Sequence, residues 1–208
     1  MKRERLVRMA LACLVGLIMA AVIAWMTIRH DQRQAAGVAT NVAPASIGGP
    51  FTLTTHEGRA VTDKDFVGKY KLVFFGYTFC PDICPTELQT IAQAMDVMGD
   101  SGADVQPLFI TIDPERDTPP VLADYVKLFH PSIIGLTGTA EQIAAVAKAY
   151  RVYYARSQGE PDPTQYLMDH STFAYLLAPD GSFVTVFAKG STPEQMVEAI
   201  NAYRSRGR

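Results

Sequence analysis

The chain has 208 residues, a formal net charge of −2 and 19% charged residues. This length accommodates one domain of ordinary size and a short appendage. The near-neutral charge, and the lack of a basic stripe interleaved with aromatic residues, argue against a nucleic-acid-binding protein. The composition therefore indicates a globular domain with an additional segment.

Residues 9–28 have the composition of a membrane-spanning helix. They carry no charge over 20 positions, and such a run crosses a hydrocarbon core about 30 Å thick. Lys and Arg residues are concentrated in residues 1–8, so the positive-inside rule keeps residues 1–8 in the cytoplasm. The alternative is a cleaved secretion signal, whose apolar region is usually about 7–15 residues long. We expect an uncleaved, single-pass anchor that exports the rest of the chain.

Residues 29–49 lack periodicity and are rich in alanine, glycine and polar residues. This composition predicts a flexible linker, and about 20 such residues have a typical reach of roughly 25 Å. The linker would hold a domain spanning residues 50–204 close to the membrane surface.

Strand and helix patterns alternate along residues 50–204. Short strands are expected on both sides of Gly58, and a continuous apolar run at 71–77 predicts a strand buried on both faces. The later elements are a helix at 85–99, a strand at 107–112, a helix at 122–129, a strand at 132–136, a helix at 140–150, a hairpin of strands 172–177 and 182–187, and a helix from 192.

This order of elements predicts an α/β sheet with some antiparallel pairing. Cys80 and Cys84 fall between the first central strand and its helix, which is typical of a thioredoxin-like fold. We therefore expect a thioredoxin-like domain with an N-terminal β-hairpin, preceded by a single transmembrane helix.

Cys80 and Cys84 could form a structural disulfide, a redox couple or a metal site. A disulfide that closes so small a loop stabilises little, and a domain of this size does not need it. Cys84 lies just before the predicted helix, whose N-terminus favours a thiolate. Pro81 and Pro85 stiffen the turn. Two thiolates suit a soft metal such as Cu(I) or Zn.

The spacing of the cysteines calls for a third metal ligand elsewhere in the chain. Three residues separate the cysteines, one more than in thioredoxin-type oxidoreductases, and no second pair is present to complete a four-cysteine zinc site. His30, His56 and His130 are expected to be solvated. His170 precedes a buried strand, in a segment that a thioredoxin-like sheet returns to the cysteine turn. Position alone leaves open whether His170 is a ligand.

Four segments resemble the Sco/SenC family of membrane-tethered copper proteins. The resemblance spans residues 48–203 and depends above all on a C-P-D-x-C-P motif followed much later by D-H. The segments are GYTFCPDICPTEL, FITIDPERDTP, FHPSIIGLTG and MDHSTFAYLLAPDG. The resemblance implies that Cys80, Cys84 and His170 hold one copper ion, Cu(I) or Cu(II), and that Cys80 and Cys84 also form a redox disulfide.

Two aspartates are candidates for an outer layer around this site. Asp169 could orient His170 through a hydrogen bond or donate an oxygen to Cu(II). Asp113, in the segment DPERD, could tune the site or meet a partner; the commoner role of such a turn is helix capping and salt bridging. Met168 is expected to pack rather than to bind metal.

The resemblance implies a metallochaperone rather than an enzyme with turnover. It would receive copper from an upstream donor protein and deliver it to the dinuclear CuA centre in subunit II of cytochrome c oxidase. The alternative is a thiol–disulfide oxidoreductase that reduces the acceptor's cysteines and needs Cys80 and Cys84 but not His170. A thiol peroxidase fits less well, because Thr78 does not form the T-x-x-C signature. The absence of a transit-like leader favours a bacterial inner membrane, with the domain in the periplasm.

Overall fold

A computed structural model describes residues 19, 47–157 and 165–206 of the chain. The chain divides at Ala45/Ser46 into two units, and every described residue except Met19 belongs to the second. Among the described residues, no helix combines the length and the apolar composition of a membrane span. The predicted anchor at 9–28 lies outside the described residues except for Met19, and so does most of the predicted linker.

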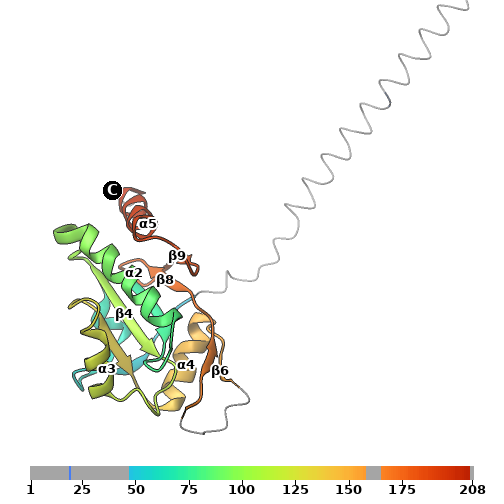
Figure 1. Ribbon diagram of the computed structural model, residues 1–208. Coiled ribbons are helices and arrows are strands. Elements are labelled where there is room, and N and C mark those ends of the chain that lie inside the picture. Colours follow the sequence, from blue (N-terminus) through green and yellow to red (C-terminus); the bar gives the residue numbers. More distant parts are fainter. Residues whose placement is uncertain (1–18, 20–46, 158–164, 207–208) are drawn as a thin grey trace, which may run out of the picture. The chain divides into compact units, whose positions relative to one another are not determined.

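A seven-stranded mixed sheet forms the centre of the domain (Figure 1), in the order β2-β1-β5-β4-β3-β8-β9. Its strands are β1 (Thr52–Thr55), β2 (Ala60–Thr62), β3 (Tyr70–Gly76), β4 (Val105–Thr111), β5 (Ile134–Thr137), β8 (Ala174–Leu177) and β9 (Phe183–Phe187). β3, β4 and β5 run parallel, whereas β1–β2 and β8–β9 are antiparallel pairs. The predicted N-terminal hairpin and closing hairpin are both confirmed.

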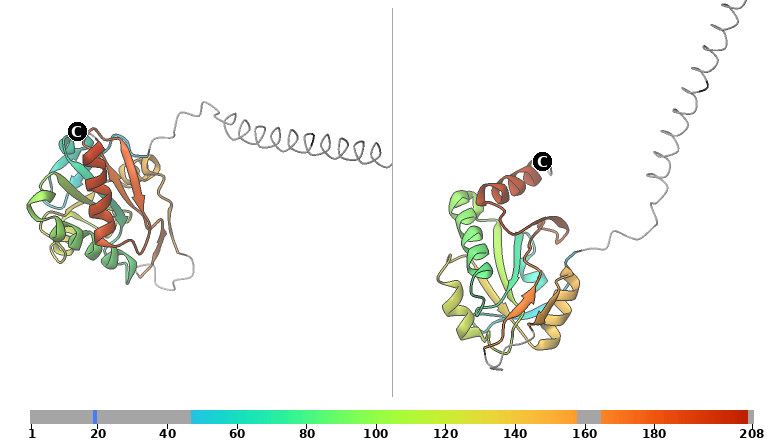
Figure 2. Two further views of the ribbon diagram at one scale, coloured as in Figure 1. Left: turned by 90° about the horizontal axis from the view of Figure 1, so that it is seen from above. Right: turned by 45° about the vertical axis from the view of Figure 1, so that its right-hand side comes forward.

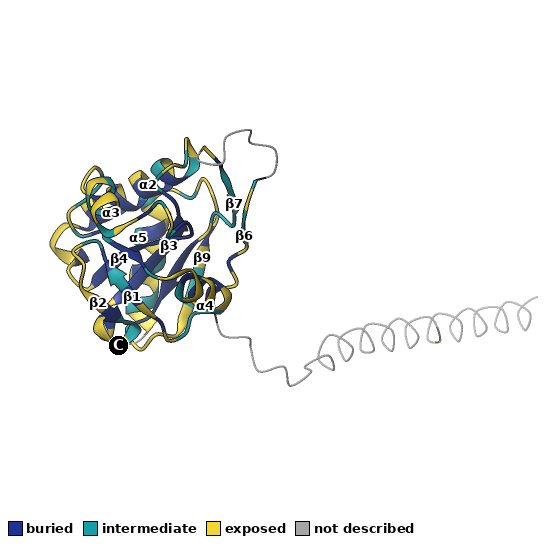
Figure 3. Ribbon diagram, turned by 90° about the horizontal axis from the view of Figure 1, so that it is seen from below, coloured by how far each residue is buried: buried dark blue, intermediate teal, exposed yellow. Residues whose placement is uncertain are grey.

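The core lies around β3 and β4, whose residues are all buried (Figure 3). This burial follows from their continuous apolar sequences, which suit strands covered on both faces. The helices are α2 (Ile83–Met98), α3 (Pro119–Val126), α4 (Ala140–Tyr150) and α5 (Pro193–Arg206), with short 3₁₀ turns η1 (Asp63–Phe66) and η2 (Gly99–Gly102). α2 and α5 pack side by side (Figure 2), α3 contacts β5, and α4 contacts β1.

The ends of two helices were correctly predicted, but the start of α2 was not. Gly99 ends α2, and Thr139 with Gln142 forms the capping box of α4. α2 begins at Ile83 rather than at Pro85, so Cys84 lies inside its first turn. The first turn tolerates a proline at this position because the N–H groups there have no partner within the helix.

A second, two-stranded sheet was not predicted. β6 (Tyr154–Arg156) pairs antiparallel with β7 (Met168–His170), outside the seven-stranded sheet. His170 therefore lies at the end of a strand rather than in a loop. Strands of three residues are too short to show a period in the sequence, which explains why this pair was missed.

Candidate metal centre

The end of β3 and the first turn of α2 position the two cysteines. Cys84 is fully buried, Cys80 is half-buried, and both thiols are free. The Cys84 backbone N–H donates to the Cys80 sulfur at 3.3 Å. Gly76 makes room for this arrangement, because a Cβ at that position would lie 2.8 Å from the Cys84 sulfur and 2.9 Å from the Phe109 ring.

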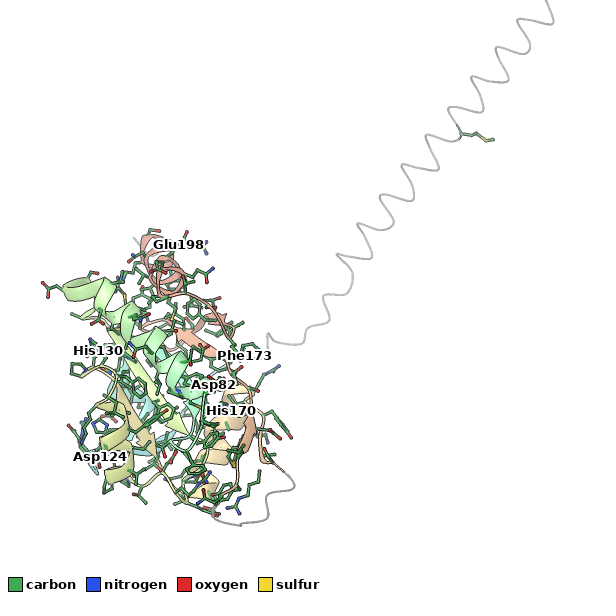
Figure 4. All side chains as sticks on the ribbon, viewed as in Figure 1. Asp82, Asp124, His130, His170, Phe173 and Glu198 are labelled. Atoms are coloured by element: carbon green, nitrogen blue, oxygen red, sulfur yellow. The ribbon has the colours of Figure 1, made fainter. Side chains whose placement is uncertain are left out.

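His170 completes a compact set of three potential ligands. The ligand atoms of Cys80, Cys84 and His170 all lie within 4.8 Å of one another, and His170 Nε2 is 3.5 Å from Cys84 Sγ. His170 Nδ1 is 2.9 Å from the carbonyl oxygen of Ser171. Since a carbonyl only accepts, Nδ1 donates to it, and in a neutral imidazole the lone pair is then on Nε2, which faces the Cys84 sulfur. His170 and Asp82, the residue before α2, line the same cavity, and both are labelled in Figure 4.

The two thiols differ in acidity, in the opposite sense to the prediction for Cys84. The pKa of Cys80 is lowered, chiefly because the Cys84 thiol donates a hydrogen bond to it. The pKa of Cys84 is raised, because its thiol is that donor and because it is buried. A thiolate is therefore favoured at Cys80, which accepts hydrogen bonds from the Cys84 thiol and from the Cys84 backbone N–H, and not at Cys84.

Asp169 and Asp113 take different positions around the ligands. Asp169 is exposed and lines a cavity of about 350 Å³ beside Cys80 and His170. The imidazole is held by the hydrogen bond that its Nδ1 donates to the Ser171 carbonyl, so metal ligation or tuning by Asp169 stays a prediction. Asp113 is buried and accepts hydrogen bonds from the Tyr166 hydroxyl (2.7 Å) and Arg116 Nε (2.5 Å). The contact with Arg116 is consistent with a salt-bridged turn, which the sequence analysis gave as the commoner role of such a segment.

Asp117, also in the segment DPERD, supports the site through contacts that the sequence did not predict. Its buried carboxylate accepts from the Thr78 N–H (3.0 Å), the Thr78 hydroxyl (2.6 Å) and the Thr111 hydroxyl (2.5 Å). Burial raises the pKa of this carboxyl group. Asp117 thereby ties the cysteine turn, two residues before Cys80, to the end of β4. The segment DPERD indicated a turn, but it did not indicate that Asp117 binds Thr78.

The donor set selects the kind of metal. Two sulfurs and one imidazole nitrogen suit soft or borderline ions such as Cu(I), Cu(II) and Zn(II), and not the hard cations that prefer oxygen. Among the described residues these three side chains form the single such cluster. His56 accepts instead from the Gly135 N–H, and His130 contacts Ser132. His30 lies outside the described residues.

The model of the SCO1/SenC family matches residues 39–205 of the chain. The chain belongs to this family. It is 42% identical over 195 residues to Protein SenC of Rhodobacter capsulatus, covering 93% of this chain and 86% of that protein. It is 44% identical over 174 residues to Protein sco1 of Schizosaccharomyces pombe, covering 83% and 66%. With the human mitochondrial SCO1 homolog it shares 45% identity over 166 residues, covering 77% and 55%.

This SCO1/SenC chain thus spans about two thirds of the fission-yeast protein and about half of the human one. Among solved structures it resembles Arabidopsis thaliana ScoI with copper bound, with a TM-score of 0.72 and 44% identity over 77% of this chain and 99% of that one. Bradyrhizobium japonicum ScoI with copper bound gives a TM-score of 0.71, 44% identity, and 76% and 99% coverage. These similarities confirm the predicted thioredoxin-like α/β fold.

Proposed function

We propose that this protein is a copper metallochaperone that binds one copper ion through Cys80, Cys84 and His170. The observation that carries the proposal is the approach of their three ligand atoms to within 4.8 Å. The two ScoI structures, each 44% identical to this chain, are described as copper-bound. Copper is here the cargo that the protein passes on.

The geometry suggests how copper is taken up and released. Three ligands leave a side of the ion open toward the cavity lined by Asp82 and Asp169. A thiolate of the acceptor can bond to copper from that side and displace one ligand at a time, without a change in oxidation state. Since the pKa of Cys84 is raised, copper binding must expel its proton, and a proton returns to Cys84 when copper leaves.

We propose that the acceptor is the CuA centre of cytochrome c oxidase subunit II, and that an upstream protein donates the copper. In this proposal residues 9–28 anchor the protein in a bacterial inner membrane, residues 29–49 form the linker, and residues 50–204 form the periplasmic copper-binding domain. The lack of charge in residues 9–28 and the basic residues on the N-terminal side support this orientation.

A thiol–disulfide oxidoreductase is the second candidate function. The lowered pKa of Cys80 and its contact with Cys84 suit disulfide exchange. Such a protein would form a Cys80–Cys84 disulfide as it reduces the disulfide between the two cysteines of the acceptor. It has no need for an imidazole, whereas a copper carrier loses one of three ligands when His170 is replaced.

His170→Ala separates these two functions, with Cys84→Ser as the variant that disables both. A titration of the reduced protein with Cu(I) should reach one copper per monomer for the wild type and fall in Cys84→Ser. His170→Ala should lose stable Cu(II) binding and fail to support oxidase assembly in a deletion strain, while its disulfide still forms and is reduced. Full oxidase activity with His170→Ala, at equal expression, would favour the reductase.

A further inference from the structure

The strand that carries His170 is not part of the main sheet. β7 pairs with β6 over three residues in a separate two-stranded sheet. Two-stranded sheets of this size are marginally stable in isolation. Cys80 and Cys84, in contrast, are held between the buried strand β3 and the helix α2. Apart from the short chain connection to β8, the position of the imidazole therefore depends on side-chain contacts between β6–β7 and the rest of the domain.

Tyr166, four residues before His170, provides such contacts. Its hydroxyl donates to Asp113 at 2.7 Å, and the residue is only 7% exposed. The guanidinium carbons of Arg116 and Arg156 lie 3.7 and 4.0 Å from the centre of its ring. Cation–π contacts at such distances are stabilising, more so when they are desolvated. We call these four residues the Tyr166 cluster.

The Tyr166 cluster reaches both the cysteine turn and the small sheet. Arg116 Nε binds Asp113, and its guanidinium lies 4.7 Å from the ring of Phe79, the residue next to Cys80. Arg156 belongs to β6. The cluster therefore fastens the segment leading into β7 to the turn that carries the first cysteine.

A second link joins the same two segments. The Tyr77 hydroxyl accepts a hydrogen bond from the Met168 N–H at 3.2 Å, and the Tyr77 ring packs edge-on against the His170 ring with centroids 5.9 Å apart. This link acts within the three-residue strand itself. On the approach to β7, the Leu167 carbonyl accepts a hydrogen bond from the Ser157 N–H at 2.9 Å, and the Tyr166 cluster holds the side chain of the residue before it.

We propose that Tyr166 is a positioning residue for the third metal ligand, holding β7 so that His170 Nε2 stays beside the two sulfurs. This inference rests on the proposed copper-binding function. Loss of the Tyr166 ring would leave the dithiol in place and release the imidazole. The consequence is selective: properties that need the imidazole change, and properties that need only the thiols do not.

Two substitutions at Tyr166 test the proposal in the full-length protein in detergent. Tyr166→Leu removes both the ring stacking and the hydrogen bond to Asp113, whereas Tyr166→Phe removes the hydrogen bond alone. With Cu(II) alone as the probe, Tyr166→Leu should bind about 10–100-fold more weakly, the loss typical of residues that support a metal ligand. Tyr166→Phe should fall between this variant and the wild type.

Three further measurements distinguish positioning from a general effect on stability. The nitrogen hyperfine splitting from the imidazole in the Cu(II) electron paramagnetic resonance spectrum should weaken in Tyr166→Leu. The equilibrium of the Cys80–Cys84 disulfide with glutathione should not change. As a matched control, Tyr203→Leu removes another tyrosine from an aromatic–arginine cluster, where Tyr203 packs edge-on against Tyr70 and Arg204 lies over Tyr70. It should leave Cu(II) binding as in the wild type.

Wild-type Cu(II) affinity and an unchanged spectrum in Tyr166→Leu would overturn the inference. So would an equal loss of Cu(II) affinity in Tyr203→Leu. If Tyr166→Leu does not fold, Tyr166→Phe decides the question by the same spectrum and affinity. Failure of the proposed function is recognised separately, since the wild type and His170→Ala would then bind Cu(II) equally.

Discussion

Replacement of Asp117 by alanine should destabilise the cysteine turn without removing any metal ligand. The carboxylate is fully buried and accepts three hydrogen bonds, two from Thr78 and one from Thr111. Alanine leaves all three donors without this acceptor. The Thr78 groups are half-exposed and can turn to water, but the Thr111 hydroxyl is fully buried.

The expected loss of stability follows from how far each of the three donors is exposed to water. A buried donor that loses its acceptor costs about 1–3 kcal/mol, and the half-exposed donors lose less. The wild-type carboxylate itself pays for desolvation, as its raised pKa indicates, which offsets part of the loss. We therefore expect Asp117→Ala to lower the free energy of unfolding by about 2–4 kcal/mol. Asp117→Asn, which keeps one acceptor oxygen, should cost about 1 kcal/mol.

Urea unfolding of the reduced, metal-free protein measures this loss as a lower midpoint at an unchanged slope. Asp124→Ala is the control, because Asp124 is 78% exposed and pairs on the surface with Lys127. That variant should stay within about 0.5 kcal/mol of the wild type. An Asp117→Ala protein that unfolds at the same urea concentration as Asp124→Ala would refute the reasoning.

Three further predictions concern the ligands directly. Gly76→Ala places a methyl group 2.8 Å from the Cys84 sulfur and 2.9 Å from Phe109, so it should destabilise the protein by about 1–3 kcal/mol in thermal unfolding and shift the sulfur-to-copper charge-transfer band. Iodoacetamide should alkylate Cys80 of the metal-free protein at lower pH than an ordinary thiol, and Cys84 hardly at all, because their pKa values move in opposite directions. Asp169→Asn should weaken Cu(II) binding by about 10-fold in a competition titration, at the low end of the usual loss, because Asp169 lines the cavity beside Cys80 and His170 but does not hold the imidazole.

Each of these predictions has an outcome that contradicts it. A Gly76→Ala protein with wild-type stability and spectrum would mean that the Cys84 sulfur is not confined as described. Peptide mapping that finds Cys84 modified first would reverse the assignment of the thiolate. Unchanged Cu(II) affinity in Asp169→Asn would restrict Asp169 to a surface role, since its carboxylate is exposed in the structure.

Much of the fold was predictable from local sequence. The apolar runs that became β3 and β4, the glycine that ends α2 and the capping box at Thr139 are each encoded by a few adjacent residues. Such patterns are reliable because burial of a strand, and satisfaction of N–H groups at a helix end, depend mainly on residues close in sequence. The cysteine spacing likewise predicted a chemically active turn after β3.

Tertiary structure alone decided how the site is assembled. His170 reaches the cysteines across 86 residues of sequence, through a three-residue strand with no periodic signal. Asp117 and Tyr166 find their partners 39 and 53 residues away, at Thr78 and Asp113.

The acidity of the cysteines also required the tertiary structure. The sequence placed the thiolate at Cys84 because that residue lies at a helix N-terminus, but packing buries this thiol and makes it a donor to Cys80. A pKa depends on desolvation and on the donors that packing brings within reach, and neither is a property of adjacent residues. The sequence by itself therefore predicted the candidate residues, and the packing of β3, α2 and β7 decided which of them meet and which thiol is the more acidic.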